Sequence, residues 1–297
     1  MCAVGVSVLA WRGQADYAGA MTTLAAEMLA AARRLCQEVE AMRFGPPVTH
    51  VYNPLVYAWA AQARYIERYG STRKQVVLLG MNPGPFGMGQ TGVPFGEVAR
   101  VRDFLGIEAP VLRPAVEHPA RPVLGFACTR SEVSGSRVWG LVAGRWGTAQ
   151  AFFADFYVAN YCPLLFMEAS GKNRTPDKLA SAERAALTAA CDRHLQRTIE
   201  LLAPQWVIGI GAYAEQQART ALGERVKIGR ILHPSPASPA ANLGWADAAV
   251  AELRGLGIPV PDPKDRSEAA PAKAARTRAV RAVRAVRSTG GTRALGG

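Results

Sequence analysis

Residues 76–97 have the sequence VVLLGMNPGPFGMGQTGVPFGE, and the architecture of the chain can be worked out from them. The apolar, β-branched start of this stretch predicts a buried strand. Glycine and proline follow at once, so the chain can neither continue as sheet nor begin a helix there. It must form a tight loop at the carboxyl end of the strand, where open α/β sheets bind their ligands. The loop carries the amide of Asn82 and the ring of Phe95, with almost no charge before Glu97, which suits a flat, neutral, hydrogen-bonding ligand.

The rest of the chain alternates between predicted strands and helices. Strands are predicted at 122–126, 156–160, 206–211 and 227–232, and helices at 20–43, 55–69, 93–105, 176–202 and 212–222. This alternation predicts an α/β fold with a central, mainly parallel sheet and helices on both faces, a three-layer α/β/α arrangement. Asn82, Asn160 and His233 each follow a predicted strand. Because the carboxyl ends of parallel strands share one edge of the sheet, we expect these three residues to converge.

Composition indicates a globular protein for most of the length, which allows one large α/β domain or two small ones. The chain has 297 residues, of which 49% are hydrophobic, and no apolar run long enough to span a membrane. We expect a flexible leader at 1–20, a single domain at 21–260 and a disordered basic tail at 261–297. About half of the net charge of +12 falls in that tail. It is either a solvated extension or a cationic arm that binds the phosphate backbone of a nucleic acid.

The cysteines and the glycine spacing exclude several classes of site. The five cysteines are scattered and include no C-x-x-C pair, which favours reduced thiols in an intracellular compartment over disulfides, zinc or an iron–sulfur cluster. We therefore expect no metal and no cofactor. The glycine-rich loop lacks the G-x-x-x-x-G-K-[ST] spacing of a phosphate-binding nucleoside triphosphatase.

Residues 44–257 resemble the single-strand-selective monofunctional uracil-DNA glycosylases, members of the uracil-DNA glycosylase superfamily. The resemblance rests on the 80–97 loop together with His-Pro-Ser-Pro at 233–236, and on YNP at 52–54, YAW at 57–59, EVSGSR at 132–137, NYCPL at 160–164 and SGKN at 170–173. It implies the same layered α/β/α fold. It also implies a base-excision-repair enzyme that hydrolyses the N-glycosidic bond of uracil, and of 5-hydroxymethyluracil, in single- and double-stranded DNA. We expect a monomer, located with the nucleoid in a bacterium or in the nucleus of a eukaryote.

Two residues are candidates for catalysis. Breaking the bond places negative charge on the departing base, and a His233 donor aimed at uracil O2 would stabilise that anion. Asn82 can orient a water but cannot deprotonate it, so the mechanism would be dissociative. The alternatives are a histidine that only bonds a backbone carbonyl and an asparagine that closes an Asx-turn before Pro83.

Four residues are candidates for binding the base. Phe95 would stack on it, unless it is a core residue under the loop. Asn160 would pair with N3–H and O4 and reject cytosine, unless it only caps the strand end. Met81 and Gly84 would line the pocket through their backbone, and the resemblance implies that Gly84 leaves space at C5.

Other residues are candidates for contacts with DNA. The resemblance implies that the loop from His233 enters the base stack, through Ser235, Pro236, Ala237 and Ser238. Many relatives have a long basic residue where this chain has Ala237, which predicts weaker wedging. Lys172 and Asn173, with Arg174, are candidate phosphate contacts. Neither motif contains the lysine that a lyase step needs, so the DNA strand should stay intact.

Two alternatives remain open at this point. One is a glycosylase of the same fold that prefers xanthine, hypoxanthine or a mismatch. The other is a non-catalytic DNA-binding module that keeps the pocket. Incubation with a uracil-containing oligonucleotide distinguishes the module from an enzyme.

Overall fold

A four-stranded parallel sheet forms the centre of the structure, a computed structural model that describes residues 23–263. The strand order is β3-β2-β6-β7, and every neighbouring pair is parallel. The four strands are β3 (Phe156–Asn160), β2 (Val76–Gly80), β6 (Trp206–Ile210) and β7 (Lys227–Ile231). All five residues of β2 are buried, as the apolar run predicts for a strand covered on both faces.

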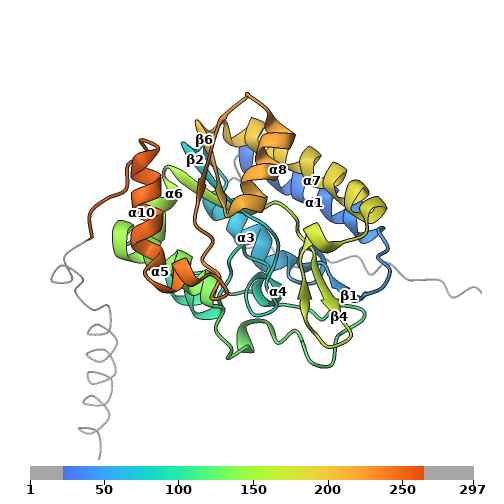
Figure 1. Cartoon of the computed structure of the whole chain (residues 1–297). Helices are drawn as coiled ribbons and strands as arrows, with labels where there is room; N and C mark the ends of the chain where they lie inside the picture. Colours follow the sequence, from blue (N-terminus) through green and yellow to red (C-terminus); the bar gives the residue numbers. More distant parts are fainter. Residues whose placement is uncertain (1–22, 264–297) are drawn as a thin grey trace, which may run out of the picture. The chain divides into compact units, whose positions relative to one another are not determined.

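Helices cover both faces of this sheet (Figure 1). On one side α1 (Thr23–Glu40) packs against α3 (Trp59–Tyr69) and α7 (Ser181–Leu202), and α7 packs against α8 (Ala212–Leu222). On the other side α5 (Val133–Trp146) packs against α6 (Ala149–Phe153) and α10 (Trp245–Gly255). The predicted three-layer α/β/α fold with a mainly parallel sheet is confirmed.

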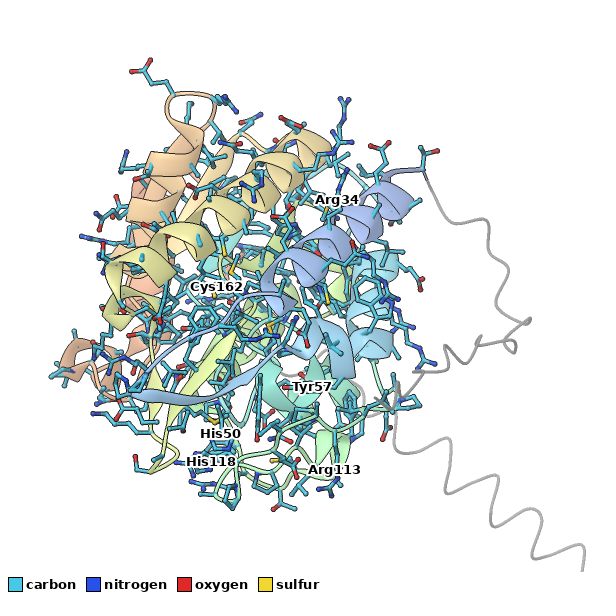
Figure 2. All side chains as sticks on the ribbon, turned by 90° about the vertical axis from the view of Figure 1, so that its right-hand side faces the viewer. Arg34, His50, Tyr57, Arg113, His118 and Cys162 are labelled. Atoms are coloured by element: carbon cyan, nitrogen blue, oxygen red, sulfur yellow. The ribbon has the colours of Figure 1, made fainter. Side chains whose placement is uncertain are left out.

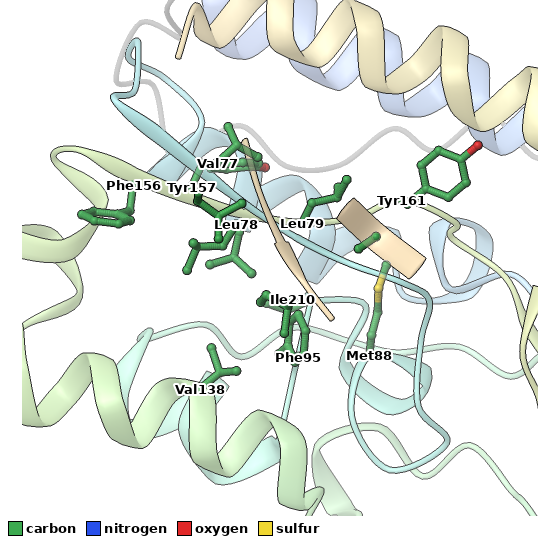
Figure 3. Close-up of a cluster of buried hydrophobic side chains, with 14 of the residues drawn as sticks. Val77, Leu78, Leu79, Met88, Phe95, Val138, Phe156, Tyr157, Tyr161 and Ile210 are labelled. Atoms are coloured by element: carbon green, nitrogen blue, oxygen red, sulfur yellow. The ribbon is translucent and has the colours of Figure 1, made fainter. Parts of the chain in front are cut away.

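Aromatic side chains fill much of the core between these layers. The rings of Phe152 and Phe156 stack with their centroids 4.9 Å apart, and Trp146 meets both of them edge-on. Figure 3 shows Phe156 and Tyr157 at one end of the sheet, and Phe95 and Met88 at the other. The same apolar core therefore reaches from the middle of the sheet to the loop that follows β2.

A second, three-stranded antiparallel sheet was not predicted from the sequence. It has the order β1-β4-β5, from β1 (Val48–Tyr52), β4 (Leu165–Glu168) and β5 (Asn173–Arg174). The hydroxyl of Tyr52 accepts from His118 N at 2.7 Å and donates to Arg121 O at 2.9 Å. His50 and His118 lie together beside it, with ring centroids 4.6 Å apart (Figure 2). This sheet thus fixes the irregular segment around residues 118–121.

The helix predicted at 93–105 is wrong over its first residues. The chain forms α4 (Met88–Thr91) instead and becomes helical again only at Val98, ending in the π-helical turn η1 (Arg100–Phe104). Pro94 cannot donate a helical hydrogen bond, and Phe95 has a φ of +52°, which no right-handed helix contains. The intervening turn carries Phe95 back towards the sheet.

The strand predicted at 122–126 is also wrong, because a side chain satisfies the backbone there. Gln90 accepts from Leu124 N at 2.8 Å and from Gly125 N at 3.1 Å, and it donates to Pro122 O at 3.1 Å. Gly125, with a φ of +59°, then starts the 3₁₀ turn η2 (Gly125–Ala127). The segment needs no partner strand.

Several helix boundaries differ from the prediction. The helix predicted at 55–69 is two helices, α2 (Pro54–Tyr57) and α3, separated by Ala58. The one predicted at 176–202 begins as the 3₁₀ turn η3 (Pro176–Lys178) and becomes α7 only at Ser181. Helix α1 ends at Glu40, short of residue 43. Helices α5, α6, α10 and the short α9 (Pro239–Asn242) were not predicted.

The structure describes neither end of the chain. The leader predicted at 1–20 lies outside the described residues, as does the basic tail from residue 264 onward. Between residues 23 and 263, no helix is both long and apolar enough to cross a membrane.

The close approach of α8 to β6 depends on a glycine. A Cβ on Gly209 would lie 2.3 Å from the backbone nitrogen of Glu215, so Gly209→Ala must push the helix away from the strand. We expect this variant to lower the free energy of unfolding by about 1–3 kcal/mol. Gly144 on α5 has nothing within 4 Å of its Cβ position, so Gly144→Ala should raise that free energy by up to about 1 kcal/mol. Urea denaturation measures both, and equal stability of the two variants would contradict the packing described here.

Candidate functional site

The three polar residues predicted to converge do follow strands that end at one edge of the sheet. Gly80 at the end of β2 is in register with Asn160 at the end of β3. The pairing continues past both strands, because Tyr161 N donates to Gly80 O and Cys162 N donates to Met81 O, each at 2.9 Å. His233 follows β7, which is separated from β2 only by β6. At about 4.8 Å between strands, the edge offers roughly 10 Å between the β2 loop and the His233 loop, enough for a flat ring.

Asn160 and Phe95 meet directly over Gly80. A Cβ on Gly80 would lie 2.4 Å from Asn160 Oδ1 and 2.6 Å from Phe95 Cε2, so only glycine fits. Asn160 Nδ2 lies 3.2 Å from the sulfur of Met88, which sequence reasoning missed. Met88 and Asn160 also line a cavity of about 50 Å³ whose other walls are mostly core residues, and neither Asn82 nor His233 lines it. The site therefore joins a hydrogen-bonding amide to an aromatic edge at one point of the sheet.

The burial of Phe95 supports its interpretation as a core residue, and its stacking on a base stays a prediction. It is only 8% exposed and belongs to the hydrophobic core, and the edge of its ring shares the space over Gly80 with Asn160. Its left-handed backbone costs about 1–2 kcal/mol. That conformation is held by its own carbonyl, which accepts from Trp139 Nε1 at 2.9 Å and from Glu97 N at 2.8 Å. Trp139 is thus a supporting residue that sequence reasoning missed.

Asn82 is oriented by a bond across the site. Its Nδ2 donates to Leu164 O at 3.1 Å and, more weakly, to Pro83 O at 3.4 Å. Both bonds use the nitrogen, so the side chain is fixed with its oxygen available as an acceptor. An acceptor of this kind can hold a water molecule through one of its hydrogens.

His233 is arranged as a neutral donor. Its Nδ1 accepts from Ser235 N at 3.1 Å, which leaves the ring proton on Nε2. Burial lowers the pKa of His233 below its ordinary value, so the imidazole is uncharged at neutral pH. The ring packs against Gly211 at the end of β6, where a Cβ would lie 3.2 Å from His233 Cδ2. A neutral imidazole can still donate from Nε2 to an oxygen on which negative charge develops.

The loop after His233 is braced by side chains. Arg137 of α5 donates to Pro234 O at 3.0 Å and to Asn242 Oδ1 at 2.8 Å. The Ser235 hydroxyl accepts from Ala237 N, and Ser238 caps α9. Pro236 and Ala237 are exposed, whereas Ser235 and Ser238 are half-buried. Leu243, just after α9, is 91% exposed, so the exposed part of this region also includes a large apolar side chain.

The candidate phosphate contacts at residues 172–174 differ in whether the protein itself already binds their side chains. Lys172 and Asn173 are exposed at the turn into β5. Arg174 is paired instead, with its Nη1 2.9 Å from Glu168 Oε1 and its Nε donating to Lys178 O. Arg174 is therefore held within the protein, and the prediction that it contacts phosphate is not supported by its geometry.

Glu132, just before α5, has a buried carboxyl group that was not predicted from the sequence. A Cβ on Gly84 would lie 2.3 Å from its Oε1, and one on Gly87 would lie 2.2 Å from its Oε2. The glycine at 84 is therefore required by Glu132, a reason that the sequence did not suggest. Oε2 has no exposed surface and no hydrogen-bond partner. Burial raises the pKa of Glu132 to about 7; the backbone of Gly135 opposes this shift, and nearby Glu97 adds to it.

The described part of the chain offers no metal centre. Among residues 23–263, no cluster of three or more histidine, cysteine or acidic side chains is placed to hold an ion. Cys36, Cys128, Cys162 and Cys191 are free and buried, and Cys2 lies outside the described residues.

Comparison with known proteins identifies the class to which this fold and site belong. A family model described as the uracil DNA glycosylase superfamily matches residues 67–254, so the chain belongs to that superfamily. A crystal structure of wild-type SMUG2 from Pedobacter heparinus has the same fold, with a TM-score of 0.55 at 20% identity, over 76% of this chain and 98% of that one.

Relatives of higher sequence identity show the family within this superfamily to which the chain belongs. A single-strand selective monofunctional uracil DNA glycosylase of Mus musculus is 48% identical over 241 residues, which are 80% of this chain and 86% of the relative. The corresponding protein of Rattus norvegicus is 50% identical over 228 residues, or 76% of this chain and 82% of the relative. The chain is a member of the single-strand selective monofunctional uracil DNA glycosylase family.

The ionisation of Glu132 should be visible in the pH dependence of stability. Folding raises its pKa from about 4.5 to about 7, so the folded state favours the protonated form. The resulting stabilisation is complete below pH 4.5 and is lost as the pH rises through 7. Relative to Glu132→Gln, the wild type should therefore lose on the order of 1–3 kcal/mol between pH 4.5 and 8. Urea denaturation across this range measures the difference. Glu224→Gln, at an exposed position, is the control, and a pH-independent difference for Glu132→Gln would refute the assignment.

Proposed function

We propose that this protein hydrolyses the N-glycosidic bond between uracil and deoxyribose in DNA, releasing the base and leaving an abasic site for base-excision repair. The observation that carries this proposal is the meeting of Asn160 and Phe95 over Gly80, on the sheet edge where Asn82 and His233 also stand. The names of the relatives, which are monofunctional uracil DNA glycosylases, support the same activity.

Recognition of uracil follows from the Asn160 amide. Uracil presents an N3–H donor beside its O4 acceptor, and an amide offers the complementary acceptor and donor. Cytosine presents the opposite pattern, which leaves polar groups unpaired and costs about 1–3 kcal/mol in a buried site. Phe95 offers an aromatic edge at the same point. The neutral surroundings of both residues suit an uncharged base.

Bond cleavage then relies on charge stabilisation and a positioned water. As the glycosidic bond breaks, electrons move onto the base, and the Nε2–H of neutral His233 stabilises the charge that develops on O2. Asn82 Oδ1 holds the water that adds to the sugar cation. Glu132 lies behind the Asn82 loop, but its Oε2 is sealed from solvent, so it is not placed to deprotonate that water. This arrangement supports a dissociative pathway.

The proposal extends to three further properties. We include 5-hydroxymethyluracil on the strength of the family resemblance alone, because the Cβ position of Gly84 faces Glu132 rather than the base. The small exposed surface of Pro236 and Ala237 favours single strands, in which no neighbouring base stack must be filled, and we include duplex DNA as a slower substrate. We also propose that the protein acts as a monomer, because the residues assigned to the reaction all come from one chain.

The activity is tested with uracil-containing oligonucleotides. The purified protein should release uracil without added metal, and the strand should break only after alkali or heat. Asn82→Ala and His233→Ala should each lower the single-turnover rate by about 10²–10³-fold, because each removes a group that acts on the transition state. Their DNA affinity, measured by fluorescence anisotropy, should stay near that of the wild type. Absence of uracil release from both single-stranded and duplex DNA would refute the proposed function.

A second test concerns base choice. Asn160→Asp replaces the amide NH₂, the donor to uracil O4, with a carboxyl oxygen. In its protonated form this carboxyl can match cytosine. The rate on uracil should fall by about tenfold to a hundredfold, and release of cytosine should become detectable. Full uracil activity and unchanged selectivity in this variant would show that Asn160 does not read the base.

A further inference from the structure

Two arginines lie against one aromatic ring on the loop that carries Asn82. The Cζ atom of Arg130 is 3.9 Å from the centre of the Phe86 ring, and that of Arg121 is 5.5 Å from it. Such contacts contribute about 0.5–1 kcal/mol each at exposed sites and restrict the otherwise mobile guanidinium groups. The two positive charges are therefore held at a fixed place beside the Asn82 loop.

Neither charge is neutralised by the surrounding protein. Within residues 23–263, no carboxylate forms an ion pair with Arg121 or Arg130, although Arg102, Arg113 and Arg174 are all paired. Arg121 donates from Nη1 to Ala120 O at 2.9 Å, and its buried Nε has no partner. Unpaired arginines that are also held in place are typical of anion sites rather than of structural ion pairs.

A third cation adjoins these two arginines. A Cβ on Gly171 would lie 3.4 Å from Arg121 Cγ, so the turn that carries exposed Lys172 packs directly against the Arg121 stem. The backbone of Arg121 is fixed in turn by Tyr52 and by its own bond to His118 O at 2.9 Å. His118, which is labelled in Figure 2, lies in this region next to the three-stranded sheet. Three separate segments thus bring unpaired positive charge to one region.

This region is connected to the reaction site through the same loop. Phe86 follows Asn82 by four residues, and Gln90 of the loop donates to both Pro85 O and Pro122 O. The Arg121 segment is thereby tied to the Asn82 loop. An anion bound here would be held at a fixed position relative to the residue that positions the water.

We propose that Phe86, Arg121, Arg130 and Lys172 form a binding site for the phosphate backbone of the DNA strand next to the excised base. This inference rests on the proposed function. A phosphodiester carries the charge and the paired oxygens that guanidinium groups bind best. The ring face of Phe86 is already occupied by Arg130, which favours phosphate over a stacked base as the ligand.

The test compares variants that change the net charge equally. Arg130→Ala should weaken binding of a single-stranded oligonucleotide about threefold to tenfold at low salt. It should also reduce the slope of log affinity against log salt by about 0.7, the value for one phosphate contact on a single strand. Arg102→Ala removes an arginine that is also exposed but is paired with Asp103, and its slope should match that of the wild type. The single-turnover rate at saturating enzyme should be unchanged in Arg102→Ala.

Two further variants separate charge from geometry. Arg130→Lys should keep the salt slope but lose affinity, because lysine lacks the planar fork. Phe86→Leu should do the same, because the charges remain while the ring that holds them is lost. Equal salt slopes for Arg130→Ala and Arg102→Ala would overturn the proposal. A wild-type protein that bound DNA with the expected slopes but released no uracil would instead refute the proposed function alone.

Discussion

The site depends on the absence of a side chain at Gly80. Strands β2 and β3 pair in parallel up to Gly80 and Asn160, and the Asn160 amide and the Phe95 ring then occupy the space that any Cβ at 80 would need. The amide is thereby brought against the sheet itself rather than held on a mobile loop. Hydrogen bonding between strands fixes the position of Asn160, and close packing over Gly80 fixes the position of Phe95 relative to it. The precision of the site comes from the rigidity of the sheet.

A similar constraint organises the loop behind Asn82. The Glu132 carboxyl fits only because residues 84, 87 and 135 are all glycines, and a Cβ on any of them would lie within 3 Å of one of its oxygens. A buried acid with an unpaired oxygen is unfavourable for folding, and so is the left-handed backbone of Phe95. Unfavourable features of this kind gather at functional sites, where the surrounding structure holds them in place. Here Trp139, anchored in the core of α5, provides part of that support.

The central sheet could be predicted from the sequence because buried parallel strands are continuous apolar runs with abrupt ends. The predicted strand at 156–160 matches β3, and the expectation that polar residues gather at the strand ends follows from the topology of any parallel sheet. The rest depends on contacts between distant residues. Gln90 satisfies the backbone at 122–125, which removes the need for a strand there, and no local pattern in the sequence indicates that bond. The role of Glu132 was equally invisible, because it follows from three glycines in two separate segments.

The proposed base-binding pocket and the proposed phosphate site around Phe86 differ in charge. Where the base would bind, the groups are neutral: two amides, an aromatic ring and an imidazole whose pKa burial has lowered. A permanent positive charge there would hold any anion, including a phosphate, and so would compete with the base. Around Phe86, by contrast, the cations are permanent and unpaired. Contacts with the DNA phosphate backbone, which is the same for every sequence, can then hold the strand. The neutral pocket discriminates between bases by hydrogen bonds alone. On this proposal, selectivity for uracil and affinity for DNA reside in separate residues joined by one short loop, so each can be adjusted independently.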